Sequence, residues 1–319
     1  MHQTRVVSMT EGGVLAAVAV VFALVSVYIP VLGTFVNLIW PVPVILLGVR
    51  HGFKWSILTT IVAGAIIALM MHPLQAASIV VGFGLIGIVL GHAIRSGMSP
   101  ARAMLWGGAA SLVSKAAVLG LVAVVMGINP LNTQSEAMGK AMEQAMNFYR
   151  TIGLNEQTIA QTAEMMQHVT ELMKIIIPAA FVMAAGVDTY LNFVVARAVL
   201  KKLGHPVPGF PPFKNWHMPL VVAYAFGISL VMIYFGKARE VPELYSVGLN
   251  LQMLSSVLLL IQGLALFYFL ADKYSLSRFV RGLILVLIFS NGILTQAVIF
   301  TGAFDLILDY RHLRSPRSG

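Results

Sequence analysis

Nine apolar runs dominate this chain of 319 residues, and each is close to the length that crosses a lipid bilayer. They cover roughly 10–29, 35–49, 53–71, 76–94, 103–127, 173–199, 217–236, 244–271 and 281–304. A membrane-spanning helix needs about 20 mostly apolar residues. Only 10% of the residues are charged, against about 25% in soluble domains. The sequence therefore predicts an all-α, polytopic membrane helix bundle of eight to nine spans, the second of which contains Pro41 and Pro43 and is kinked or does not cross fully.

The distribution of Lys and Arg predicts the orientation of the bundle. Basic residues occupy alternate loops, as at Arg50 and Lys54 and again at Arg95 and Arg102, whereas the loops at 30–34 and 72–75 contain none. Short cytoplasmic loops carry an excess of Lys and Arg. We therefore expect a cytoplasmic N-terminus, and we ascribe the net charge of +9 to this bias.

The C-terminal tail conflicts with nine complete crossings. Arg311, Arg314 and Arg317 favour the cytoplasm, but nine crossings would place them outside. Either the last apolar run is a re-entrant hairpin that turns at 290–292, or an earlier segment does not cross the membrane.

Two polar segments divide the chain. Residues 129–172 form a Met-rich insertion, predicted on the outer side, in which Met138, Met142 and Met146 recur at helical spacing, Gly153 breaks the helix and Asn155 caps the next one. This insertion is either a helical hairpin that lies on the protein or at the membrane interface, or a lid. The Pro-rich stretch 205–216 is a predicted connector between a six-helix unit, 1–204, and the appended transmembrane helices of 217–319.

Lys115 lies near the centre of the fifth run, and Asp188 lies at a similar depth in the sixth. A lone charge at mid-bilayer costs at least about 2.5–3.5 kcal/mol. We therefore predict that the two side chains face each other, with Asn192, Ser111 and Ser114 forming a polar patch around them. Such a pair either fixes helix register or lines a cavity that binds a solute, and the sequence leaves both alternatives open.

Other residue patterns argue against enzymes and metal sites. The chain has no cysteine, which excludes disulfides and thiolate metal sites. The histidines lack ligand spacing, no phosphate-binding loop precedes a helix, and no nucleic-acid signature or Ser–His–acid pattern is visible. We expect no enzyme activity, no cofactor and no metal. The pair Asp305 and Asp309, followed by Arg311, is expected to pair with interior arginines, to close the helix end or to form a solvated terminal turn.

One face of the first helix consists of small residues, which allow another helix to approach closely. These residues are Gly12, Ala16, Ala19 and Ala23. The face is suited either to packing within this protein or to docking onto a separate membrane subunit.

The runs at 10–30, 41–58, 84–97 and 175–204 resemble the substrate-binding S component of energy-coupling-factor (ECF) transporters. The order of features matches: an alanine-rich first helix, a proline-bearing second helix, a Gly-rich fourth helix, and a last helix with Pro178 near its start. The helices after Pro206 and the closing stretch Gly302–Arg311 are similar to the YybS-like family of bacterial membrane proteins.

The ECF resemblance implies a six-helix bundle that binds a small molecule from the outer side and has no nucleotide site of its own. It further implies docking through small residues of the first helix onto a coupling subunit that ATPases drive. The leading functional prediction is thus binding, and help in transport, of a small solute. The alternative is a non-transporting membrane scaffold or assembly partner.

Overall fold

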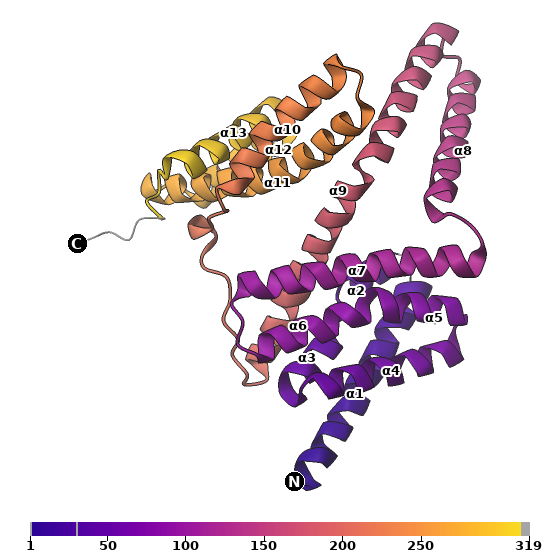
Figure 1. The fold of residues 1–319 in the computed structure, drawn as a ribbon, viewed down its shortest axis with the longest axis vertical. Helices are drawn as coiled ribbons and strands as arrows, with labels where there is room; N and C mark the ends of the chain where they lie inside the picture. Colours follow the sequence, from indigo (N-terminus) through magenta and orange to yellow (C-terminus); the bar gives the residue numbers. More distant parts are fainter. Residues whose placement is uncertain (1, 30, 314–319) are drawn as a thin grey trace. The chain divides into compact units, whose positions relative to one another are not determined.

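The computed structural model describes residues 2–29 and 31–313, and within these ranges it contains helices and no strand (Figure 1). Among these described residues, eight continuous or broken helices are long and apolar enough to cross a membrane, or nine if the bent pair 278–308 is one span. The predicted all-α membrane fold is therefore confirmed. The chain divides into two compact units: the first comprises 1–170 and 181–209, and the second comprises 171–180 and 210–319. The division between 209 and 210 lies within the predicted connector.

The first unit contains the spans predicted for the N-terminal part of the chain. Its helices are α1 (His2–Tyr28), α2 (Leu32–Leu38), α3 (Val42–His51), α4 (Phe53–Met70), α5 (Pro73–Ile79), the π-helical turn η1 (Val80–Gly84), α6 (Leu85–Arg95), α7 (Pro100–Met126), α8 (Pro130–Thr151) and most of α9 (Glu156–Lys202). The helices α2 and α3 form one span that is broken at 39–41, as the prolines predict.

The small-residue face of α1 is buried inside the first unit. Ala16, Ala19 and Ala23 are at most 1% exposed and belong to a core that includes side chains of α3 and α4. The Trp40 indole, at the break between α2 and α3, donates a 2.8 Å hydrogen bond to the Ala19 carbonyl. Gly12 is also buried, between Leu47 and Thr59. The docking alternative is therefore wrong for this face, because the protein's own helices already cover it.

The polar insertion folds as a helical hairpin. Gly153 adopts a left-handed φ of 81° between α8 and α9, and the Asn155 side chain accepts a 2.7 Å hydrogen bond from the Thr158 amide. Met146 is buried, and Met138 and Met142 are partly buried. The predicted break, cap and amphipathic period are confirmed. The lid stays a prediction.

The second unit is built on the helices α10 (Val221–Ala238), α11 (Pro242–Lys273), α12 (Arg278–Ser290) and α13 (Gly292–Leu308), together with the short turn η2 (Phe213–Asn215). Two glycines bring α11 and α13 together. A Cβ atom added to Gly302 would lie 2.1 Å from the Leu259 carbonyl oxygen, and one added to Gly263 would lie 2.1 Å from the Val298 carbonyl oxygen. The two backbones are thus in direct contact.

This contact predicts a sharp difference between two glycines of the second unit. Gly302→Ala should lower the free energy of unfolding by about 1–3 kcal/mol, because the added methyl meets rigid backbone. Gly282→Ala is the matched control, since nothing lies within 4 Å of its Cβ position. Unfolding in mixed detergent micelles measures both. Equal stability of the two variants would contradict the close contact of α11 and α13.

The last apolar run breaks between α12 and α13, which differ in direction by 106°. Asn291 caps α13 by accepting hydrogen bonds from the amides of Ile293 and Leu294. The first turn of α12 and the residues that follow α13 both lie beside the connector. In the first turn of α12, Arg281 bonds Asp272 at 2.6 Å, and Asp272 also binds Lys214 at 2.8 Å. After α13, Arg311 donates to the Lys214 carbonyl at 2.6 Å. The pair therefore returns to the end where it began, as a re-entrant hairpin does.

A labelling experiment tests this topology directly, because the natural chain has no cysteine. Single cysteines at Asn215, Glu240 and His312 should split into two classes. We expect a membrane-impermeant maleimide to label Asn215→Cys and His312→Cys from the same side, and Glu240→Cys, between α10 and α11, from the other. Labelling of His312→Cys together with Glu240→Cys would show that α12 and α13 make a complete crossing.

Candidate functional site

A polar centre lies where α7 packs against the last part of α9 in the first unit. A small residue permits the approach: a Cβ atom on Gly107 would lie 2.5 Å from the Thr189 methyl carbon and 2.7 Å from a methyl carbon of Leu90. Gly107 is one helical turn before Ser111 on α7, and Thr189 follows Asp188 on α9. Close packing here brings the polar side chains of the two helices within hydrogen-bonding reach.

Lys115 and Asp188 meet at this centre, as predicted from their depth. The Lys115 Nζ lies 2.5 Å from the Asp188 Oδ2. The Ser111 hydroxyl accepts a hydrogen bond from Nζ at 3.1 Å and donates one to Oδ2 at 3.4 Å. The exposed fractions of the two charged side chains differ, at 22% for Lys115 and 4% for Asp188. The carboxylate is therefore fixed in the interior, and the lysine is its more accessible partner.

Asn192, one turn beyond Asp188, connects the centre to α2. Its Nδ2 donates to the Leu38 carbonyl at 2.9 Å and to the Asp188 carbonyl at 2.8 Å. Both amide hydrogens are thereby used, and this sets the orientation of the amide group. The sequence predicted Asn192 as part of the polar patch but gave no sign of its bond to Leu38.

Three buried oxygens of this centre have no hydrogen-bond partner among the described residues. They are Ser114 Oγ, Asp188 Oδ1 and Asn192 Oδ1, on residues that are at most 3% exposed. An unsatisfied buried polar group costs about 1–3 kcal/mol, and such groups are rare in folded proteins. The structure thus connects Lys115, Asp188, Ser111 and Asn192 by hydrogen bonds, with Ser114 next to Lys115 on α7. Three of these five predicted residues keep unused hydrogen-bonding capacity.

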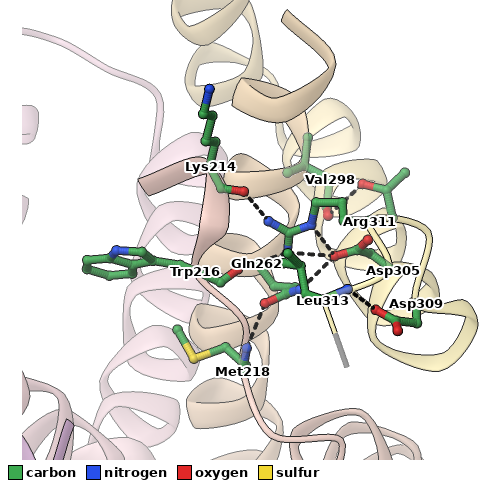
Figure 2. Close-up of polar contacts among 10 residues, drawn as sticks. Lys214, Trp216, Met218, Gln262, Val298, Asp305, Asp309, Arg311 and Leu313 are labelled. Atoms are coloured by element: carbon green, nitrogen blue, oxygen red, sulfur yellow. Dashed lines mark hydrogen bonds and ion pairs between the residues drawn. The ribbon is translucent and has the colours of Figure 1, made fainter. Parts of the chain in front are cut away.

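A second polar centre lies in the second unit, at the end of α13 (Figure 2). The Arg311 guanidinium binds the Asp305 Oδ2 through Nε at 3.1 Å and Nη2 at 2.8 Å. It also donates to the carbonyls of Lys214 and Trp216. The Gln262 amide donates to the same Asp305 oxygen at 2.6 Å and accepts from the Met218 amide at 2.9 Å. The network ties α11, α13 and the connector together.

This network corrects the prediction for the C-terminal motif. The side chains of Asp305 and Arg311 are each 1% exposed, so the solvated terminal turn is wrong. Asp305 pairs with Arg311 of the same motif, six residues later. Asp309 instead ends α13 in a left-handed conformation, with φ 48°, and accepts a hydrogen bond from the Leu313 amide. Gln262 was missed, because a glutamine within an apolar run carries no signal of its partner.

A chain of contacts between α1 and α3 was also missed. The Ser8 hydroxyl lies 2.7 Å from His51 Nδ1, His51 Nε2 contacts Glu11, and Arg50 binds Glu11 at 2.7 Å. The three side chains thus form a hydroxyl–imidazole–carboxylate series, which no sequence pattern predicted. Ser8 is 6% exposed and lies within a regular helix. We interpret these contacts as joining α1 to the end of α3.

Comparisons with known proteins agree with the fold. Residues 17–306 match the family described as "Predicted membrane protein (DUF2232)". The chain is also similar to the uncharacterized protein YybS of Bacillus subtilis (strain 168), at 25% identity over 316 residues, which cover 96% of this chain and 97% of YybS. No solved structure matches.

Proposed function

The chain belongs to the DUF2232 family of predicted membrane proteins, and from this premise we propose that it binds a small solute within the bilayer and helps it to cross. The observation that carries the proposal is the set of three unpartnered oxygens beside the Lys115–Asp188 pair. Ionisable residues within membrane helices most often mark solute or ion pathways. Three unused oxygens lie in this centre, against one, Asp305 Oδ1, at the Asp305–Arg311 pair of the second unit, and this larger unused capacity favours a binding site over a purely structural contact.

The likeness to ECF S components supports the same function and stays a prediction. It would add an outer-side pocket and a partner assembly of a membrane coupling subunit with ATPases. Because the small-residue face of α1 is buried, such a partner would have to dock on another surface. We further propose a binding protein rather than an enzyme, in the bacterial inner membrane, with a cytoplasmic N-terminus.

The scaffold alternative rests on a different observation, the closed geometry of the pair. Asp188 is 4% exposed and already holds Lys115 at 2.5 Å, so the pair could serve only to fix α7 against α9. The two functions differ in what the three unpartnered oxygens do. In a scaffold they are a tolerated cost, whereas in a binding protein they contact the solute.

Ser114→Ala separates the two functions, because the Ser114 hydroxyl makes no hydrogen bond within the described protein. If a solute uses this hydroxyl, its affinity should fall about tenfold, the value of one hydrogen bond, while thermal stability without solute is unchanged or higher. Native mass spectrometry from lipid nanodiscs measures the bound fraction. Ser111→Ala is the control that removes internal hydrogen bonds and should lower stability. No bound solute in the wild-type protein would favour the scaffold.

A further inference from the structure

The hydrogen-bonding groups of the polar centre indicate what kind of solute it would accept, an inference that rests on the proposed function. The Asp188 carboxylate has one occupied and one unoccupied oxygen. Oδ2 takes the Lys115 ammonium and the Ser111 hydroxyl, and Oδ1 has no partner among the described residues. An ionised carboxylate only accepts hydrogen bonds. The free oxygen therefore calls for an N–H or O–H donor.

Asn192 also presents an acceptor oxygen without a donor. Its two amide hydrogens are spent on the carbonyls of Leu38 and Asp188, and a flipped amide would bring Oδ1 against these two carbonyl oxygens. The amide thus presents only its oxygen, which is also an acceptor. Asp188 and Asn192 are four residues apart on α9, so their side chains lie on one face, about 5–6 Å apart at Cβ. A molecule bound here would have to bring two donor groups to these oxygens.

The remaining groups supply the opposite polarity. The Ser114 hydroxyl, which lies on α7 and is 1% exposed, can donate as well as accept. The Lys115 ammonium has three hydrogens and uses two of them, on Asp188 and Ser111. A solute that places donors toward α9 can therefore place an acceptor toward α7.

The charge of the centre selects against ions. Lys115 and Asp188 carry opposite charges in direct contact, so the centre is neutral as a whole. A solute with a net charge would bring an uncompensated charge into a buried site, which is strongly unfavourable. An anion would also meet two acceptor oxygens, and a cation would meet the Lys115 ammonium.

We infer that the centre takes a small solute without net charge, neutral or zwitterionic, that presents at least two hydrogen-bond donors to Asp188 and Asn192 and an acceptor to Ser114. The arrangement excludes simple carboxylates, phosphates and alkylammonium ions as preferred occupants. It also excludes apolar compounds, which would leave the three oxygens unsatisfied.

A defined mixture of compounds tests this inference on the full-length protein in nanodiscs. The probes are four uncharged or zwitterionic donors (uracil, nicotinamide, myo-inositol and glycine), four anions (nicotinate, benzoate, succinate and phosphate) and four cations (choline, ethylenediamine, benzylamine and 3-aminomethylpyridine). After incubation and washing, bound compounds, including any that co-purified from the cells, are released with methanol and quantified by mass spectrometry. We expect a net-neutral compound to be enriched at least tenfold over the charged ones, and to be bound about tenfold less by Ser114→Ala.

The other outcomes are distinct from one another. Enrichment of an anion or a cation that is reduced about tenfold in Ser114→Ala would overturn the inference about net charge and leave solute binding in place. No compound above the Ser114→Ala background would overturn solute binding and the inference with it.

As a second variant, Asp188→Asn keeps the shape of the side chain and gives the centre a charge of +1, so it should shift the enrichment toward the anions by at least tenfold. An unchanged selectivity in a folded Asp188→Asn protein would contradict the role of charge.

Discussion

Replacing Arg311 by leucine is expected to lower the free energy of unfolding of the second unit by about 3–5 kcal/mol, the cost of removing one partner from a buried ion pair. Arg311 and Asp305 are each 1% exposed, so the carboxylate of the variant stays buried with only the Gln262 amide to compensate it. The carbonyls of Lys214 and Trp216 would lose their donor as well.

Unfolding by increasing detergent fraction in mixed micelles measures this loss. Arg278→Leu is the matched control, because Arg278 is an exposed arginine in the first turn of α12, and its variant should stay within about 0.5 kcal/mol of wild type. The double variant Asp305→Leu with Arg311→Leu removes both charges and should recover more than half of the lost stability. A single Arg311→Leu protein as stable as wild type would show that the network of Figure 2 does not hold the connector.

The spans could be predicted from sequence because their signal is local. About 20 apolar residues in a row suffice to identify a helix that crosses a membrane, and prolines and glycines mark its breaks, as at Pro41 and Gly153. The pairing of Lys115 with Asp188 was also predictable, since depth in the bilayer follows from counting residues along each helix. Both predictions depend on distance along one helix and not on how the chain folds back.

What the sequence left open depends on contacts between distant residues. The sequence left two alternatives for α12 and α13, and the bond from Arg311 to the Lys214 carbonyl, 97 residues earlier, favours the re-entrant one. The bond from Asn192 to Leu38 spans 154 residues. The burial of the α1 face was likewise unpredictable, because small residues fit an internal neighbour and a separate subunit equally well. Periodicity identifies a face but not the helix that covers it.

A contact between α11 and α9 within the second unit was likewise not predictable from the sequence. Pro178 lacks an amide hydrogen and interrupts the helical hydrogen bonds there. The Asn250 side chain of α11 donates to the Ile175 carbonyl at 2.7 Å and accepts from the Ala179 amide at 2.8 Å. The sequence placed Pro178 near the start of a membrane helix, but nothing in it indicated a contact with Asn250.

Lys115→Met should destabilise the first unit more than Asp188→Leu, by about 3–5 kcal/mol against wild type for the former. The reason is the unequal exposure of the two side chains, 22% for Lys115 and 4% for Asp188. Without the lysine, the carboxylate stays buried with the Ser111 hydroxyl as its side-chain partner. Without the aspartate, the long lysine side chain can turn its ammonium toward its exposed side. The same micelle titration gives both values, and equal losses would contradict the argument.

Combining the two substitutions separates stability from binding. The double variant Lys115→Met with Asp188→Leu has no buried charge and should regain most of the stability lost by Lys115→Met. We expect native mass spectrometry to detect no solute bound to this double variant, because the leucine at position 188 removes one of the two acceptor side chains on α9. The exchange of charges, Lys115→Asp with Asp188→Lys, is the sharper comparison. If the exchange restores both stability and solute binding, the pair only holds α7 to α9. If it restores stability alone, the position of each charge matters to the solute, and the Lys115–Asp188 pair is part of the binding site itself.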